Sequence, residues 1–231
     1  MILAVAHPIV YHPSDRALRL NEAVLPKGQG ARQRAIQVPP RLLDGSDLIP
    51  IFNQYVGFGD MVVATEVSTM LARKSKTVRL RMASGVELAD LRNAPALLIG
   101  AVTNRWTMEF QQNWRFRFAH TPEATAVIVD SATPGRQWSI PAQEDGSAPD
   151  DYILICRLSN PMTGGLVLVA AGIKQFGTEA AGRELVDADR LGAVLRQLPA
   201  GWETRNLQVV LHARVINSAA GIPELVAWHV W

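Results

Sequence analysis

Three junctions in the sequence place glycine or a small polar residue directly after an apolar run or at the start of an expected helix. They begin at Gly57, Gly100 and Gly172. In open α/β sheets, ligands bind outside the carboxyl ends of the strands, where the first turns of helices offer free N–H groups. The junctions therefore predict the walls of one ligand-binding crevice. The residues expected to line it are Gly57, Gly59, Asp60, Gly100, Asn104, Trp106, Thr107, Lys174, Gly177 and Thr178.

Asn104 is the residue of this crevice that we expect to matter most. Polar donors beside the indole of Trp106, directly after a buried strand, suit recognition of a small planar or polar ligand. A second interpretation stays open for all three junctions, because glycines permit tight turns and asparagine and threonine cap helices. In that interpretation Trp106 packs a helix onto the sheet, and Lys174 is a solvated residue rather than a partner for an anion.

The common catalytic and phosphate-binding motifs are absent from the sequence. Neither a P-loop nor a complete G-x-G-x-x-G is present, and Asp60, expected to cap a helix from Met61, would repel a phosphate. HExxH and G-x-S-x-G do not occur, and the single cysteine, Cys156, lies in an apolar run that predicts a buried thiol. We therefore predict no catalytic residue and no metal site, and the sequence leaves any cofactor unknown.

An enzyme remains an alternative interpretation. A metal-dependent enzyme acting on a nucleotide or phosphoester, such as a nucleotide cyclase, needs two metal-binding aspartates at strand ends. Asp60 and Asp130 are the candidates by elimination.

The order of apolar runs predicts the elements that carry these residues. In the first half, runs at 2–6, 78–82 and 96–101 alternate with helical patterns near 60–74 and 86–93, which is typical of a parallel sheet covered on both faces. In the second half, strict alternation and Pro/Gly-rich turns predict antiparallel strands. The expected fold is a three-layer α/β domain with a mixed sheet, Rossmann-like and parallel in its first half and antiparallel in its second. The second-half strands are expected at 114–119, 126–129, 137–140, 152–158, 166–171, 207–216 and 224–231, with helices near 178–185 and 187–198.

The segment between the first strand and the first long helix is different. Residues 9–11 are expected to extend the first strand, and residues 13–48 are irregular apart from a short helix near 16–24. A loop of this length in a compact domain is often functional.

The bulk composition sets the class of protein. The 231 residues are 48% hydrophobic and 19% charged, which suits a single globular domain over 1–231. A net charge of +2 does not suggest a partner nucleic acid. No stretch of 18 apolar residues or signal peptide is present, and a buried strand starts at Ile2, so we expect a domain excised from a longer protein.

Several segments together resemble an uncharacterised bacterial domain found in C-terminal regions of longer proteins, downstream of a membrane segment and in some cases of a winged-helix or other signalling module. The resemblance covers residues 2–231 and implies a sensor or regulatory domain, with no established catalytic residues. The segments are YVGFGDM (55–61), DLRNAPALLIGAVTNRWT (90–107), WRFRF (114–118), DYILICRL (151–158), VLVAAGIKQFGTEAAGREL (167–185) and NLQVVLHARVI (206–216).

The leading hypothesis is a non-catalytic domain that binds a small molecule in a sensory or regulatory bacterial protein. Its membrane contact would lie only in an upstream segment, with the domain on the periplasmic or cytoplasmic side. A structural dimerisation domain, acting through an edge strand or an apolar patch, is the remaining alternative. The sequence does not determine the ligand or the oligomeric state.

Overall fold

The computed structural model describes residues 1–24, 38–121, 126–141, 148–160 and 162–231. By their contacts these residues form two units, one of Met1–His7 with Val56–Trp231 and one of Pro8–Tyr55. The single domain expected over 1–231 stays a prediction. Within the described ranges, no helix has the length and apolar character needed to cross a bilayer.

The larger unit is built on a mixed sheet. Four strands pair in parallel in the order β4-β1-β5-β10, and the sheet continues through antiparallel β9 and β11, with β12 and β13 both paired to β11. The parallel first half and antiparallel second half confirm the expected α/β fold. The strands are β1 (Ile2–Val5), β4 (Arg79–Met82), β5 (Ala96–Ile99), β9 (Asp150–Ser159), β10 (Leu166–Gly172), β11 (Leu207–Ile216), β12 (Ala219–Ala220) and β13 (Glu224–Val230).

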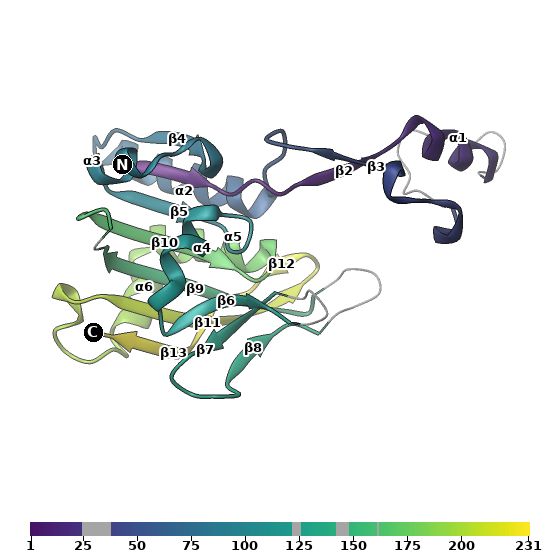
Figure 1. The fold of residues 1–231 in the computed structure, drawn as a ribbon. Helices are drawn as coiled ribbons and strands as arrows, with labels where there is room; N and C mark the ends of the chain where they lie inside the picture. The colour runs from purple at the N-terminus through teal and green to yellow at the C-terminus, as the bar shows by residue number, and fades with distance from the viewer. Residues whose placement is uncertain (25–37, 122–125, 142–147, 161) are drawn as a thin grey trace. The chain divides into compact units, whose positions relative to one another are not determined.

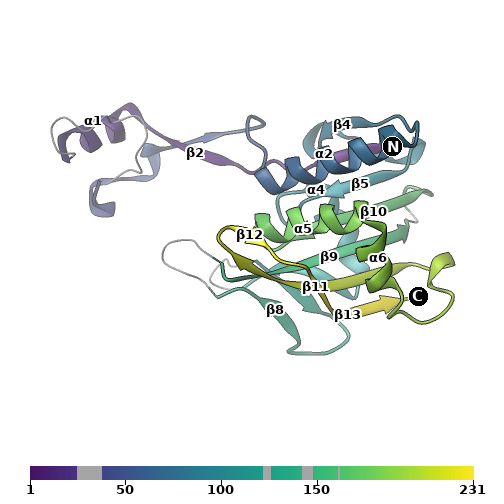
Figure 2. The ribbon, with the colours of Figure 1, turned by 180° about the vertical axis from the view of Figure 1, so that it is seen from behind.

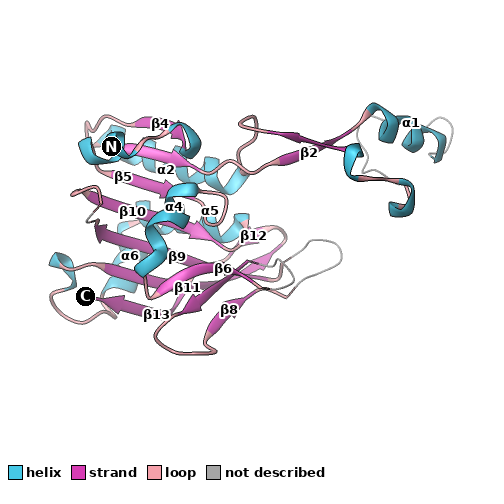
Figure 3. Cartoon of the chain, viewed as in Figure 1, coloured by secondary structure: helices cyan, strands magenta, loops and turns pink. Residues whose placement is uncertain are grey.

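Two layers cover this sheet, as Figures 1 and 2 show from opposite sides. Three helices pack on one face, and two short helices and a second, three-stranded antiparallel sheet lie over the other (Figure 3). The first face carries α2 (Phe58–Arg73), α5 (Gln175–Val186) and α6 (Ala188–Leu195), and the second carries α3 (Leu88–Asn93), α4 (Arg105–Phe110), β6 (Phe116–His120), β7 (Ala126–Asp130) and β8 (Gln137–Ser139).

The apolar pattern of the strands explains these layers. In β1, Ile2 and Ala4 belong to one core and Leu3 and Val5 to the other, so a continuous apolar run fits a strand buried on both faces. In β6 the aromatic side chains are buried while Arg117 is exposed, as alternation predicts for a strand with one solvated face.

The smaller unit, Pro8–Tyr55, contains an antiparallel pair of short strands, β2 (Val10–Pro13) and β3 (Leu48–Ile51). The prediction that residues 9–11 extend the first strand is therefore wrong, since Val10 pairs with Ile51 and Pro8, which has no N–H to donate, separates β2 from β1. The short helix is confirmed as α1 (Asp15–Val24).

Candidate functional site

The carboxyl ends of β1, β5 and β10 form the edge where the sequence places the ligand. After β1 the chain passes through α2 to β4 on one side, and the next strand, β5, lies on the other side of β1. The strand order therefore reverses between β1 and β5, and in open α/β sheets ligands occupy the crevice at such a point. We call the loops and helix starts that follow these three strands the carboxyl edge.

The predicted junctions do meet at this edge. A Cβ atom placed on Gly59 would lie 2.1 Å from the carbonyl oxygen of Gln175, so the first turns of α2 and α5 touch. A Cβ on Gly100, whose φ is +98°, would lie 2.5 Å from Cβ of Ala6 and 3.3 Å from Oδ1 of Asp60. Glycine at these positions thus allows close approach of backbone segments rather than leaving space for a ligand.

Asn104 fills the point where the strand order reverses. Its Nδ2 donates to the carbonyl of Ala4 in β1 at 2.8 Å and to that of Ile99 in β5 at 2.9 Å. Its Oδ1 accepts from the backbone N–H groups of Trp106 (3.1 Å) and Thr107 (3.4 Å), which caps α4. Through these bonds Asn104 links two strands and a helix. Because the residue is also 0% exposed, its amide offers no free group to a ligand.

The other polar side chains of the predicted set also bond to the backbone. Trp106 Nε1 donates to the carbonyl of Val86 at 3.1 Å, and Thr107 Oγ1 donates to that of Gly100 at 2.9 Å. Thr178 Oγ1 accepts from the N–H of Gly172 at 2.9 Å. The interpretation as turns and caps therefore accounts for the geometry of these residues.

Asp60 lies in the first turn of α2, which begins at Phe58 with Gly57 as its N-cap, so Asp60 does not itself cap the helix. Its carboxyl group is close to Gly57, at 3.0 Å from an ideal Cβ there, and the N–H of Gly57 bonds to it. Burial raises the pKa of Asp60 to about 6, against a smaller opposing effect of that hydrogen bond. The group is 8% exposed.

A second carboxylate, which the sequence did not select, occupies the start of α5. Asp151 in β9 is 0% exposed and accepts the backbone N–H groups of Gly177 (2.6 Å), Lys174 (3.1 Å) and Tyr152 (2.8 Å). Burial nevertheless raises the pKa of Asp151 to about 7. An anion bound at a helix N-terminus would use these same N–H groups, so the side chain already holds that position.

Lys174 remains exposed, and its charge acts to lower the pKa of Asp151, although no salt bridge links Lys174 to a carboxylate within the described ranges. Gly177 lies against Asp151, with an ideal Cβ 2.7 Å from its Cγ. Two residues after the end of β1, Nδ1 of His7 is buried and has no hydrogen-bond partner among the described residues. Three cavities lined by described residues lie away from this edge.

The metal-dependent alternative receives no support from the part of the chain that the structure describes. No group of three or more His, Cys, Asp or Glu side chains there could hold a metal ion. Asp130, one of its two candidates, lies in the small sheet and pairs with Arg115 and Arg136. Cys156 is buried, and burial raises the pKa of its thiol to about 12, which keeps it protonated.

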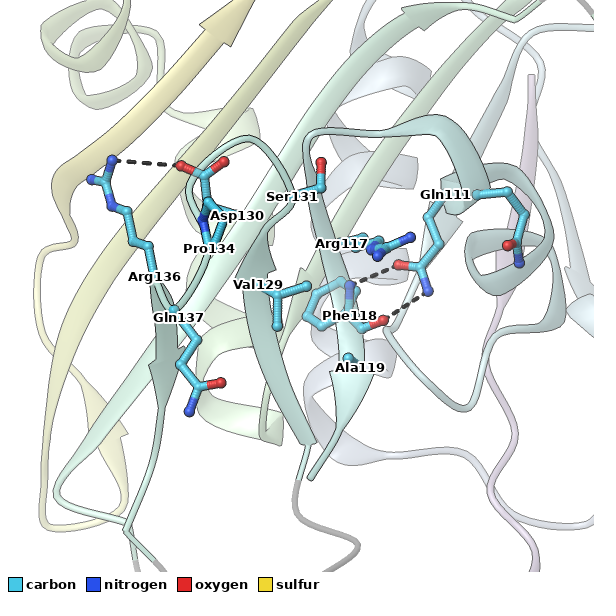
Figure 4. A pocket seen from close by; sticks show the side chains of 12 residues that line it. Gln111, Arg117, Phe118, Ala119, Val129, Asp130, Ser131, Pro134, Arg136 and Gln137 are labelled. Atoms are coloured by element: carbon cyan, nitrogen blue, oxygen red, sulfur yellow. Dashed lines mark hydrogen bonds and ion pairs between the residues drawn. The ribbon is translucent and has the colours of Figure 1, made fainter. Parts of the chain in front are cut away.

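A cavity of about 550 Å³ lies instead on the solvent side of the small sheet (Figure 4). We call it the outer-face cavity. Its floor crosses β6, β7 and β8 through Arg117, Val129 and Gln137, which are cross-strand neighbours. The 3₁₀ helix Gln111–Asn113 and the β7–β8 turn at 131–136 contribute its rim.

The charges around this cavity are unequal. The carboxylate of Asp130 accepts two hydrogen bonds from Arg115, at 2.9 and 3.0 Å, and Nη1 of Arg136 lies 3.6 Å away. The guanidinium of Arg115 holds the pKa of Asp130 below its usual value. Arg117 is exposed and pairs with no carboxylate among the described residues. The described lining thus holds two guanidinium groups, Arg117 and Arg136, against the one carboxylate of Asp130, and Arg117 remains as a positive charge without a salt bridge.

Two glutamines hold β6 so that Arg117 faces outward. Gln111 donates Nε2–H to the carbonyl of Phe118 (2.9 Å) and accepts its N–H (2.7 Å), as Figure 4 shows. Gln208 of β11 bonds Phe116 in the same way, at 2.8 and 3.1 Å. The side-chain amides replace a neighbouring strand along the free edge of β6. Sequence reasoning missed Gln208 because nothing in the sequence near it reveals a partner 92 residues away.

A comparison of the chain with protein-family models, with curated proteins and with solved structures found no match.

Proposed function

We propose that this chain is a non-catalytic binding domain that holds a small anionic molecule in the outer-face cavity. The observation that carries the proposal is the guanidinium of Arg117, which faces this cavity without a carboxylate partner among the described residues. A guanidinium binds a carboxylate or phosphate through charge-assisted hydrogen bonds, and these are among the strongest in proteins.

The cavity has the properties of a small-molecule site. Its volume of about 550 Å³ lies within the range of such sites, and it combines an apolar floor at Val129 and Ala119 with a few polar groups. Gln137 and Ser131 add neutral hydrogen-bonding groups to the cationic side chain. These features favour an organic anion over a purely apolar ligand.

The carboxyl edge is less suited to an anion. Asp60 and Asp151 place two carboxyl groups there, and the first N–H groups of α5 already bond to Asp151. Lys174 is the exposed cation of the predicted crevice. A comparison of substitutions at Lys174 and at Arg117 therefore shows whether an anion binds at the carboxyl edge or in the outer-face cavity.

The test is isothermal titration of the chain with inorganic phosphate, succinate and citrate. Arg117→Ala should weaken binding by about tenfold to a hundredfold, the effect of losing charge-assisted hydrogen bonds. Arg214→Ala, an exposed arginine on β11, is the matched control and should bind as the wild type does. A loss of binding in Lys174→Ala but not in Arg117→Ala would place the ligand at the carboxyl edge. Absence of binding by all three anions would contradict the proposal.

A sensory role in a membrane-anchored bacterial protein is part of the same proposal and is supported by the resemblance of the sequence segments. A sensor must respond to its ligand with a change elsewhere in the chain. Hydrogen exchange with and without the bound anion should therefore show altered protection beyond β6–β8. Protection confined to the cavity residues would support a binding domain without a sensory response.

An interaction role is a second candidate, because the Pro8–Tyr55 unit exposes many large apolar side chains. A ribbon of two short strands is marginally stable alone, and exposed apolar surface often marks a contact with another chain. Light scattering over a wide concentration range should show a dimer that Leu48→Ser dissociates, whereas a monomer throughout would reject this role. The exposed side chains are Ile9, Tyr11, Leu18, Val24, Leu42, Leu48, Ile49, Phe52 and Tyr55.

A further inference from the structure

A second cavity, of about 490 Å³, lies where β9 ends and the chain turns toward β10. The end of α4 and the 3₁₀ helix Gln111–Asn113 line it, together with Trp231. We call it the Trp231 cavity. It shares Gln112 with the outer-face cavity, but its lining chemistry is different.

Three asparagine amides contribute polar groups to the Trp231 cavity. Oδ1 of Asn160 accepts the N–H of Met162 at 2.8 Å, and Oδ1 of Asn206 accepts the N–H of Ser159 at 2.8 Å. These bonds fix both amides, while each Nδ2 makes no hydrogen bond to a described residue. Asn160 is only 6% exposed, so its unused donor is held in the wall of the cavity.

Asn113 adds a third amide to this wall. Its side chain is exposed and makes no hydrogen bond with the described part of the chain. An amide offers donors and an acceptor at once. The cavity therefore presents both kinds of hydrogen-bonding group in several directions.

Trp231 supplies an aromatic surface in a defined position. Its backbone exchanges two hydrogen bonds with that of Asn206, at 3.0 and 3.2 Å, and its ring stacks on His229 with 4.6 Å between centroids. The residue is still 39% exposed. The buried rings of Phe110 and Trp114 form further apolar wall.

The charge of the lining of the Trp231 cavity does not suit an anion, the class of ligand proposed for the outer-face cavity. Glu109 contributes a carboxylate, and no lysine, arginine or histidine is among the described residues that line the Trp231 cavity. An anion would therefore meet a negative group without a cation to bind it. The lining suits a neutral ligand with many hydroxyl groups.

We propose that the Trp231 cavity binds a neutral saccharide. The hydroxyl groups of a sugar ring donate and accept at once, which matches the amides of Asn113, Asn160 and Asn206. The carboxylate of Glu109 accepts a hydrogen bond from a further hydroxyl group. The C–H face of the ring packs on the indole of Trp231, which buries apolar area without requiring charge. This site is separate from the proposed anion site and does not depend on it.

The test is saturation-transfer NMR with glucose, N-acetylglucosamine and cellobiose, followed by titration of any sugar that gives a signal. Trp231→Ala should weaken binding by about tenfold, the size expected for loss of one aromatic contact and its area. Asn113→Ala should weaken it severalfold, and this exposed side chain can be removed without loss of a described contact. Trp228→Ala is the matched control, since Trp228 is 42% exposed on β13 and does not line this cavity.

Each outcome decides the proposal. Sugar binding that falls in Trp231→Ala and Asn113→Ala, with Trp228→Ala and Arg117→Ala unchanged, supports it and keeps it distinct from the anion site. Absence of transfer to all three sugars, or unchanged affinity in both cavity variants, overturns it. Adenosine is the comparison ligand, because a purine also stacks on indole. Binding of adenosine in place of the sugars would overturn the saccharide class.

Discussion

The carboxyl edge and the outer-face cavity both gather polar side chains, but they use them differently. At the edge, Asn104 and Asp151 are fully buried and bonded to the backbone. On the outer face, Arg117 and Gln137 remain exposed beside an open hollow. Convergence of polar residues at the end of a parallel sheet therefore does not by itself define a binding site. Hydrogen-bonding capacity that the protein leaves unused is the more informative property.

The reason lies in the backbone groups at the ends of the strands and at the helix starts. At the ends of β1 and β5, Asn104 donates to the carbonyls of Ala4 and Ile99, and that of Ile99 also accepts the N–H of Ala6. The N–H groups at the start of α5 need an acceptor, and Asp151 supplies it. A ligand would have to displace these internal bonds.

Asn104→Ala should produce the largest loss of stability. It removes donors from two buried carbonyls and an acceptor from two N–H groups, which should lower the free energy of unfolding by about 3–5 kcal/mol. Urea denaturation followed by circular dichroism measures this. Asn113→Ala, at an exposed asparagine, should change stability by less than about 0.5 kcal/mol. Equal effects of the two substitutions would show that the carboxyl edge is not a structural link.

Gly59→Ala should produce the next largest loss of stability. The added Cβ would lie 2.1 Å from the carbonyl oxygen of Gln175, so α2 and α5 must separate, at a cost of about 2–4 kcal/mol. The control is Gly85→Ala, because no atom lies within 4 Å of a Cβ there. Thermal unfolding of both variants tests this contrast. A wild-type midpoint in Gly59→Ala would mean that the helix starts are not in close contact.

Asp151→Asn should change the pH dependence of stability. The pKa of Asp151 is about 7 in the folded chain and lies above that of an unfolded aspartate, 3.8. The folded state therefore binds the proton more tightly, and this stabilisation is complete below about pH 4 and lost as pH rises through about 7. In the wild type the free energy of unfolding should therefore fall between about pH 4 and pH 7. Asp151→Asn, which cannot titrate, should reduce this fall by on the order of 1–3 kcal/mol.

Asp130→Asn provides the opposite case on the small sheet. Arg115 lowers the pKa of Asp130, so its stabilisation is present at neutral pH and is lost as pH falls through the lowered value. Denaturation of both variants at a series of pH values shows whether Asp151 and Asp130 contribute to the pH dependence of stability in opposite directions. Parallel profiles for Asp151→Asn and the wild type would contradict the assignment of a raised pKa to Asp151.

Arg117→Ala should have the smallest effect on stability. The side chain is exposed and unpaired among the described residues, so the free energy of unfolding should change by less than about 0.5 kcal/mol while anion binding weakens by about tenfold to a hundredfold. Denaturation and titration of the same preparation measure both quantities. A large loss of stability would mean that Arg117 serves the fold, and the contrast between the two regions would then disappear.

The class of fold and most of its elements could be predicted from the sequence alone. Continuous apolar runs such as Leu97–Ile99 identified the strands buried on both faces, and the alternation of Phe116, Arg117 and Phe118 identified a strand with one solvated face. These patterns are local, because the period of side chains along a strand or helix follows from backbone geometry alone. The meeting of the three glycine junctions was also predictable, since parallel strands end at one edge.

Which polar groups remain without a hydrogen-bond partner depends on the packing of distant segments. Asn104 reads equally as a ligand donor or as a cap until its bonds to Ala4 and Ile99 are known, and Ala4 lies 100 residues away. The bond of Gln208 to Phe116 across 92 residues, which turns Arg117 outward, is similarly hidden. A hydrogen-bonding side chain carries no local record of its distant partner. The helices and strands can therefore be predicted from the sequence, whereas the binding site depends on which polar groups the fold leaves unpaired.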